Sequence, residues 1–233
     1  MSNKKYHGKF NNRSQKHRSA KPISKQSGST QSFTKLKFDS NLLNISYEDA
    51  KARLQALLQE KAVFEYDSVL PSGRITSHYL DTKETLLSSY GAFLASVCIL
   101  HNLKDEVEFV GGALMQAYPL SQAICQLALV RGQELDSFMV RESSAARRKG
   151  LSKWIEGPLR PGAKVCIVHD EVIDGTKVIE AIRMLQDEAD AQIVQVIGVV
   201  DRMDGARSRL QDYGVDFTSI VNMDELVRED ALI

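Results

Sequence analysis

The stretch AKVCIVHDEVIDGTKVIEAI, residues 163–182, decides the fold because it joins an apolar strand to a helix through a short acidic turn. Residues 165–168 form a continuous apolar run, which is typical of a strand covered on both faces and therefore of a parallel sheet. Residues 169–171 close this strand, and Asp174 and Gly175 form the turn. Apolar side chains then recur at helical spacing, at Val178, Ile179, Ile182 and Leu185.

The end of this strand is where the sequence predicts a ligand. In an open α/β sheet, ligands lie at the carboxyl ends of the strands, where free backbone N–H groups at the start of the next helix favour an anion. Asp170 and Glu171, followed by Gly175 and Thr176, therefore indicate a phosphate or sugar phosphate site. An ordinary strand-to-helix turn with solvated acids is the alternative.

Length and composition limit the remaining interpretations. A chain of 233 residues has room for one domain of ordinary size plus an extension, and a hydrophobic content of 43% is ample for a core. No apolar run approaches the roughly 20 residues that span a bilayer, so we expect no association with a membrane. Cys98, Cys125 and Cys166 are odd in number and lie in apolar contexts, which predicts reduced core residues in a cytoplasmic protein.

Charge is segregated along the chain, although the net charge is zero. Residues 1–37 hold ten Lys and Arg residues and no acid, so the remainder has 20 basic and 30 acidic residues. Residues 1–36 have few aliphatic side chains and cannot bury enough surface to offset chain entropy, which predicts a disordered basic tail. Such a tail can contact nucleic acid, or it can be a solvated leader. The folded domain is expected over residues 46–233.

Periodicity and turn residues predict the other elements of this domain. Ser46, followed by Glu48 and Asp49, is typical of a helix start, and this helix should end near Lys61. A turn at residues 71–73 between two apolar segments predicts a hairpin. The expected strands are 62–70, 75–80, 107–110, 138–140, 193–200 and 215–220, and the further expected helices are 83–103, 206–213 and 223–227.

The acidic turn resembles the loop that binds 5-phosphoribosyl 1-pyrophosphate (PRPP) in the type I phosphoribosyltransferases. That loop has two acids, V-I, and then Thr, Ser and Gly residues that end in G-[ST]. The resemblance implies an α/β domain with a parallel sheet and an N-terminal helix and hairpin hood. It also implies that Asp170 and Glu171 hold the ribose hydroxyls and stabilise cationic charge on the sugar, and that Gly175 and Thr176 bind the 5′-phosphate.

Two alignments relate this turn to the family pattern. Without a gap, His169 replaces the first acid, and Glu171 and Ile173 replace Val and Thr. With a gap of one residue, residues 170–173 align with the acid pair and V-I, and the loop is shorter. Both alignments stay open at the level of sequence.

The phosphate cradle also contains two residues that the family does not use there. Asp174 and Lys177 stand where the family has hydroxyls and glycines, so by position both belong to the PRPP-binding residues. A carboxylate 4 Å from a phosphate is repelled by about 1 to 4 kcal/mol for effective dielectrics from that of water to that of a protein surface. The sequence therefore predicts that Asp174 weakens the phosphate site.

The segment SGRITSHYLD, residues 72–81, resembles the N-terminal hairpin of orotate phosphoribosyltransferases, S-G-x-x-S-x-x-Y-x-[DN]. Ser72, Gly73, Tyr79 and Asp81 fit this pattern. The resemblance implies that the hairpin covers the base, with Ser72, Gly73 and Tyr79 at an orotate site. A surface hairpin with an amphipathic Tyr is the alternative.

The segment GGALMQAYPLSQAI, residues 111–124, resembles the pyrophosphate-binding loop of the family, with Gln116 in place of a small residue. The resemblance implies that Gly111 and Gly112 lie against PRPP. A strand-to-helix turn that merely packs tightly would also require these two glycines.

The segment VRESSAARRKGLSKWIEG, residues 140–157, resembles the catalytic loop of the family and has no hydrophobic period. The resemblance implies that Arg141 binds PRPP, and that Arg147 and Lys149 stabilise the leaving pyrophosphate as catalytic residues. Glu142 stands where the family has its second basic residue. A solvated basic loop is the alternative.

Arg202, in VDR at residues 200–202, resembles the Arg of the family that recognises the carboxylate of orotate. A guanidinium at the carboxyl end of a strand can hold a carboxylate through two hydrogen bonds. The alternative is a surface Arg paired with Asp204.

Two functions follow from these observations. The resemblance implies an enzyme that transfers phosphoribose from PRPP to orotate, with Mg²⁺ bound through PRPP, no direct metal ligation by the protein, and a homodimer. The alternative is a catalytically impaired relative that binds a nucleotide or, through its tail, RNA. Ile173, Asp174 and Lys177 in the cradle are the residues that separate the two.

Overall fold

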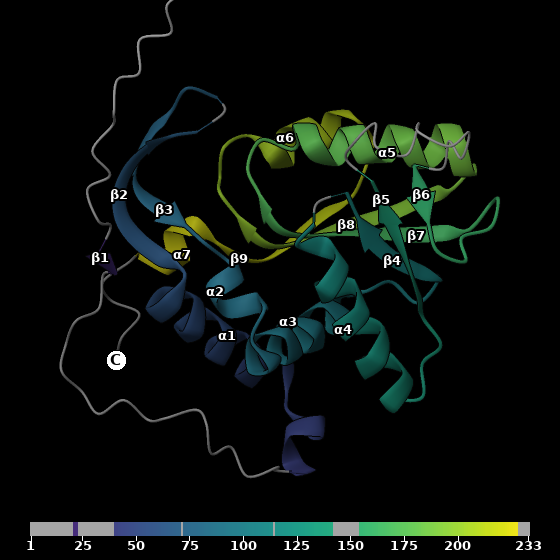
Figure 1. Ribbon diagram of the computed structural model, residues 1–233, viewed down its shortest axis with the longest axis horizontal. Helices are drawn as coiled ribbons and strands as arrows, with labels where there is room; N and C mark the ends of the chain where they lie inside the picture. The colour runs from purple at the N-terminus through teal and green to yellow at the C-terminus, as the bar shows by residue number, and fades with distance from the viewer. Residues whose placement is uncertain (1–20, 23–39, 71, 114, 142–153, 228–233) are drawn as a thin grey trace, which may run out of the picture.

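The computed structural model describes residues 21–22, 40–70, 72–113, 115–141 and 154–227 (Figure 1). Within them the strands form two sheets, one of three strands in the order β1-β2-β3 and one of six in the order β6-β5-β4-β7-β8-β9. The three cysteines are free and buried, as their apolar contexts predict. No helix in the described ranges combines the length and the apolar character that crossing a bilayer requires.

The six-stranded sheet is parallel except for β6, which runs antiparallel to β5. Without β6, the chain order of its strands is 2-1-3-4-5, so the order reverses between β4 and β7. In sheets of this order a ligand lies in the crevice at the carboxyl ends of the strands beside the reversal. The predicted fold class is therefore correct. The strands are β4 Phe109–Gly112, β5 Asp136–Val140, β6 Ile155–Glu156, β7 Lys164–Val172, β8 Gln192–Asp201 and β9 Phe217–Asn222.

Helices cover both faces of this sheet (Figure 1). On one face α1, α3 and α4 bury the side chains of Cys166 and Val168. On the other face α5 and α6 bury those of Val165 and Ile167. This burial on both faces explains why the strand is apolar without alternation. The helices are α1 Tyr47–Lys61, α3 Ser89–Asn102, α4 Ala117–Val130, α5 Thr176–Ala189, α6 Ala206–Asp212 and α7 Met223–Val227, and a 3-10 turn, η2, spans Ser40–Asn44.

The first helix of the domain begins as predicted. The Ser46 hydroxyl accepts a hydrogen bond from the backbone N–H of Asp49 at 3.0 Å, which caps α1. The predicted apolar stripe is buried, at Ala50, Leu54, Leu57 and Leu58.

The prediction of a single helix over residues 83–103 is wrong, because the structure has two helices there, α2 Lys83–Leu86 and α3. The break occurs at Ser88, whose hydroxyl accepts a hydrogen bond from the N–H of Gly91 at 3.0 Å and so caps α3. A Cβ on Gly91 would lie 2.2 Å from the carbonyl oxygen of Thr85, so only glycine permits this close approach of the two helices.

Several strand boundaries also differ from the prediction. β4 includes both glycines, Gly111 and Gly112, and β7 continues to Val172, because both remain paired with neighbouring strands. β9 starts at Phe217 rather than at Val215, because the N–H of Val215 still donates to the Leu210 carbonyl at the end of α6.

The hairpin predicted near the N-terminus is present as β2 Val63–Val69 and β3 Ile75–Leu80. Its other edge pairs with β1, Lys21–Pro22, which runs antiparallel to β2. The rest of the predicted tail, 1–20 and 23–36, lies outside the described residues. Disorder of the tail therefore stays a prediction. The pairing of β1 with β2 attaches the tail to the hairpin at Lys21–Pro22.

Candidate active site at the carboxyl edge of the sheet

Asp170 lies near the end of β7 and is 6% exposed. Its Oδ2 accepts a hydrogen bond from the hydroxyl of Thr82, the residue that precedes α2. Residues of β7 alternate between faces, so Asp170 follows Cys166 and Val168 toward the α1, α3 and α4 face. Sequence reasoning missed Thr82, because nothing in its local pattern points to a partner 88 residues away.

Glu171 and Arg202 form an ion pair at the ends of β7 and β8, with 2.9 Å between Oε1 and Nη1. Arg202 is 3% exposed, and its Nη2 donates to the carbonyl of His78 at 3.1 Å. Burial raises the pKa of Glu171, although the guanidinium of Arg202 opposes this shift. The Nε of Arg202 is buried and has no hydrogen-bond partner in the described part of the chain. The interpretation of Arg202 as a surface residue paired with Asp204 is therefore wrong.

The hairpin closes over this ion pair. Arg74, just after the hairpin turn, donates from Nη2 to the carbonyl of Arg202 at 2.9 Å and pairs with Asp204 at 3.1 Å. Together with the His78 carbonyl, these contacts attach the hairpin to the end of β8. The pattern of the hairpin predicted its presence but not the roles of Arg74 and His78, because both contacts cross more than 120 residues.

The predicted orotate residues of the hairpin have local roles in this structure. Ser72 accepts a hydrogen bond from the N–H of Arg74 at 3.2 Å within the turn. Gly73 has a φ of +88°, which L side chains rarely adopt. Tyr79 is 43% exposed, and its ring lies 6.5 Å from that of Phe64. Within the described residues, no hydrogen bond or ion pair joins Ser72, Gly73 or Tyr79 to Arg202.

Lys83, which sequence reasoning missed, lies on the hairpin side of the two acids. Its Nζ pairs with Asp81 at 2.7 Å. The hydrogen bond to Asp81 is the main cause that raises the pKa of Lys83, with smaller effects of Tyr79 and Asp170. In the sequence Lys83 follows the Asp81 of the hairpin pattern by two residues, and this spacing is a local signal for their ion pair.

The turn between β7 and α5 is only three residues long, 173–175, and its polar groups bond to one another. Asp174 accepts hydrogen bonds from the N–H and the hydroxyl of Thr176, at 3.0 and 2.6 Å. Arg209 of α6 donates from Nη1 to Asp174 at 2.6 Å and to the Thr176 hydroxyl at 2.7 Å. Burial favours the neutral acid, but the bonds from Thr176 and Arg209 outweigh it and lower the pKa of Asp174. Asp174 is thus an ionised carboxylate with an internal cation.

The end of β4 is built from backbone. A Cβ on Gly111 would lie 2.2 Å from the carbonyl oxygen of Phe138, and one on Gly112 would lie 2.5 Å from that of Val168. Close packing of the strands therefore requires both glycines, as the alternative interpretation had it. Both glycines are buried and add no side chain to this edge of the sheet.

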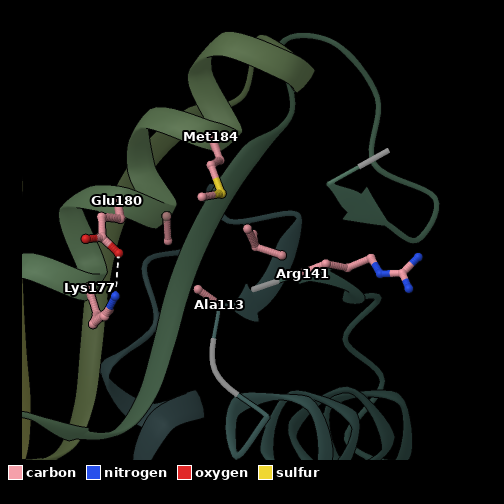
Figure 2. A pocket seen from close by; sticks show the side chains of 7 residues that line it. Ala113, Arg141, Lys177, Glu180 and Met184 are labelled. Carbon is pink, nitrogen blue, oxygen red and sulfur yellow. Dashed lines mark hydrogen bonds and ion pairs between the residues drawn. The ribbon is translucent and has the colours of Figure 1, made fainter. Parts of the chain in front are cut away.

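A cavity of about 340 Å³ lies between α5 and the ends of β4 and β5 (Figure 2). Lys177 lies at its border and pairs with Glu180 at 2.8 Å. Figure 2 shows the guanidinium of Arg141 directed away from Lys177 and Met184, and it pairs with Glu156 at 3.0 Å. The lining residues are Ala113, Val140, Arg141, Lys177, Glu180, Ala181 and Met184.

His169, in β7 next to Asp170, is a further residue to which the sequence assigned no role. It is 1% exposed, and neither ring nitrogen has a hydrogen-bond partner within the described residues. Burial lowers its pKa, although the neighbouring Asp170 carboxylate opposes this. The neutral imidazole is therefore the favoured form.

Comparison with curated proteins decides the family. The chain is 33% identical over 180 residues to the orotate phosphoribosyltransferase of Streptomyces coelicolor, which covers 76% of this chain and 97% of that protein. The chain belongs to the orotate phosphoribosyltransferase family. A second member, from Thermosynechococcus vestitus, is 32% identical over 182 residues, 78% of this chain and 95% of its own length. No protein-family model matches the chain.

Solved structures of the orotate phosphoribosyltransferase family share the fold. The Mycobacterium tuberculosis enzyme in complex with Fe(III) dicitrate superposes with a TM-score of 0.66 at 27% identity, over 77% of this chain and 99% of that one. The same enzyme in complex with PRPP gives a TM-score of 0.62 at 27% identity, over 76% and 98% of the two chains. The similarity thus extends over about three quarters of this chain and nearly all of the solved enzyme.

Part of the predicted site of this family member lies in a segment that the structure does not describe. Arg147 and Lys149 lie outside the described residues, so their roles stay predictions. Among the residues that are described, no three His, Cys, Asp or Glu side chains are grouped so that they could hold a metal ion.

Proposed function

We propose that this protein transfers phosphoribose from PRPP to orotate, with release of pyrophosphate, in pyrimidine nucleotide biosynthesis. The observation that carries the proposal is the buried guanidinium of Arg202 at the carboxyl end of β8, in a sheet of this family. A buried donor without a partner is costly unless a ligand completes its hydrogen bonds. The Nε of Arg202 is such a donor, and the carboxylate of orotate is a fitting acceptor.

The acids beside Arg202 suit the sugar. Among the described residues, Asp170 accepts a hydrogen bond from Thr82, and Glu171 accepts one from Arg202. An ionised carboxylate can accept about four hydrogen bonds, so both keep capacity for the hydroxyls of ribose. As the bond from the anomeric carbon to pyrophosphate breaks, positive charge develops on the sugar, and nearby carboxylates stabilise it. The bond to a ring nitrogen of orotate then forms at the same carbon.

The opposite side of the site suits the leaving group. The backbone of Gly111 and Gly112 lets pyrophosphate approach the end of β4, and Arg141 follows β5 directly. The ion pair of Arg141 with Glu156 is exposed and therefore weak, so pyrophosphate, with its higher charge, can replace Glu156. Arg147 and Lys149 would add positive charge from the loop.

Mg²⁺ would accompany PRPP rather than bind to a protein cage. It prefers oxygen ligands and is commonly held by substrate phosphates and a few water molecules. Asp170 and Glu171 already accept hydrogen bonds from Thr82 and Arg202, which suits carboxylates that bind hydroxyls better than it suits metal ligands. When bound, Mg²⁺ would neutralise charge on the pyrophosphate.

The assembly and location belong to the same proposal. The family resemblance implies a homodimer in which the loop of residues 140–157 completes the site of the neighbouring subunit, in the cytoplasm. The basic tail, residues 1–36, could then contact nucleic acid without entering the site. A homodimer predicts twice the mass of the chain in sedimentation at micromolar concentration, and an active monomer would contradict it.

The test uses the full-length protein with PRPP, Mg²⁺ and orotate. Arg202→Ala should lower kcat/KM for orotate by about 10- to 100-fold, because it removes a charge-assisted contact. PRPP binding, measured by calorimetry, should be nearly unchanged. Arg183→Ala is the matched control, because Arg183 is exposed on α5 and its guanidinium lies over the ring of Tyr213.

Two outcomes would contradict the proposal. Absence of PRPP binding by a folded wild-type protein would favour a relative that binds another nucleotide or RNA. Equal orotate turnover by Arg202→Ala and the wild type would show that Arg202 does not bind orotate.

A further inference from the structure

Helix α6 packs against the turn that precedes α5. A Cβ on Gly175 would lie 3.4 Å from the Cα of Ala206 and 3.5 Å from the Cγ of Leu210. Arg209 is three residues after Ala206, so the two residues lie on the same side of α6. The sequence separation of 35 residues between Asp174 and Arg209 hides this proximity from any local pattern.

The guanidinium of Arg209 lies against both functional groups of the turn. Its Nη1 is 2.6 Å from Oδ2 of Asp174 and 2.7 Å from the hydroxyl of Thr176. Its contacts with the described residues use Nη1 alone, so Nη2 and Nε remain available as donors on the same planar group. The side chain is 47% exposed, whereas that of Asp174 is 21% exposed, so an incoming ligand meets the cation first.

Charge balance connects this contact to the predicted weakness of the phosphate site. Asp174 adds one negative charge to a turn that has to accept a phosphate, and that phosphate would be repelled. Arg209 cancels the charge of Asp174. A guanidinium also offers paired N–H groups whose geometry matches two phosphate oxygens.

We infer that Arg209 is a phosphate-binding residue of this protein and that it compensates for Asp174. The inference rests on the proposed function, because it concerns the 5′-phosphate of PRPP. In this arrangement Nη1 stays on Asp174 while the other nitrogens of Arg209 contact the phosphate. The positive charge of Arg209 thus balances the negative charge of Asp174, so the turn no longer repels the phosphate.

The experiment measures binding of ribose 5-phosphate and of PRPP with Mg²⁺ by calorimetry, together with KM and kcat, on the full-length protein. Arg209→Ala should weaken binding of both ligands by about 10- to 100-fold, the loss typical of a charge-assisted contact. The KM for orotate should change less than twofold. Arg183→Ala, the exposed control on α5, should bind both ligands as the wild type does. Arg209→Lys should restore part of the affinity.

A double variant separates compensation from a merely structural role. In Asp174→Thr/Arg209→Ala no uncompensated carboxylate remains, so binding of ribose 5-phosphate should recover by at least about tenfold relative to Arg209→Ala. Asp174→Thr alone should bind ribose 5-phosphate at least as tightly as the wild type, since Arg209 is then free for phosphate. If Arg209 only held the turn in place, the double variant would bind no better than Arg209→Ala.

The remaining outcomes distinguish failure of this inference from failure of the proposed function. If Arg209→Ala binds ribose 5-phosphate within twofold of the wild type, the inference is wrong, while orotate turnover by the wild type would still support the proposed function. If binding of ribose 5-phosphate depends on Arg209 but no orotidine 5′-phosphate forms, the proposed function is wrong and the inference stands. If the folded wild type binds neither ribose 5-phosphate nor PRPP, both are wrong.

Discussion

The ends of β4 and β7 lie side by side at the same edge of the sheet, yet they are built in opposite ways. The end of β4 is bare backbone, where Gly111 and Gly112 permit close packing and bring no charge. The end of β7 is crowded with charge, and its acids already have protein partners in Thr82, Arg202 and Arg209. The end of β4 therefore presents no charged side chain to a ligand, whereas at β7 a ligand has to share or displace internal contacts.

The largest effect should come from filling the β4 end. Gly111→Ala places a methyl group 2.2 Å from the carbonyl oxygen of Phe138. Because both strands are held in the sheet, neither backbone can move away easily, and we expect a loss of about 3 kcal/mol in the free energy of unfolding. Gly214→Ala is the control, since Gly214 has a φ of +80° and open space, and it should cost about 1 kcal/mol. Urea unfolding measures both. Equal losses would show that crowding at β4 does not set the glycine requirement.

The next effect should come from breaking the charge balance at the β7 end. Arg202→Met leaves Glu171 largely buried without its cation, which should cost about 3 kcal/mol at pH 8. The pKa of Glu171 is raised in the folded protein, so protonation of Glu171 stabilises the variant as pH falls. The deficit of Arg202→Met relative to the wild type should therefore shrink at pH 5, measured by urea unfolding at both values.

Glu171→Gln in the same background provides the control for this pH dependence. Arg202→Met/Glu171→Gln has no buried charge at the pair, so its deficit should be smaller and similar at pH 5 and pH 8. A deficit of Arg202→Met that is the same at both pH values would mean that Glu171 is not the group responsible.

A smaller effect should come from His169, which lies in β7 between the packed and the charged part of the strand. Because its pKa is lowered in the folded protein, the stability it contributes is present above the ordinary pKa of about 6.5 and is lost as pH falls through the lowered value. The wild type should therefore lose up to about 1 kcal/mol between pH 6.5 and pH 5.5 that His169→Gln does not lose. His101→Gln, at an exposed position, should keep the wild-type profile. Parallel profiles for all three proteins would contradict this assignment.

The smallest effect should come from the tail, residues 1–36, of which the structure describes Lys21–Pro22. Deletion of residues 1–36 removes the pairing of β1 with β2, a contact of two residues, and no predicted apolar face. The melting temperature should change by less than about 3 °C, and any transferase rate should be retained. A larger fall would show that β1 supports the hairpin over the site.

Local signals in the sequence were sufficient to predict most of the architecture. Apolar runs in β7 and β8, helical spacing after Gly175 and the cap at Ser46 are local signals, and each depends on residues a few positions apart. They suffice for a parallel sheet with helices on both faces, and the family motifs in their order indicated orotate phosphoribosyltransferase. The single helix over 83–103 failed because the close contact between Gly91 and Thr85 is not a property of helical periodicity.

Only the tertiary structure decided how the charges of the site are paired. The sequence indicated that Asp174 would repel phosphate and that Arg202 would be free to bind orotate, because local patterns contain only the chain neighbours of each residue. The folded chain brings Arg209 to Asp174 and Glu171 to Arg202 across 35 and 31 residues. Coulomb energy depends on distance in space and on burial, and neither quantity is encoded in local spacing.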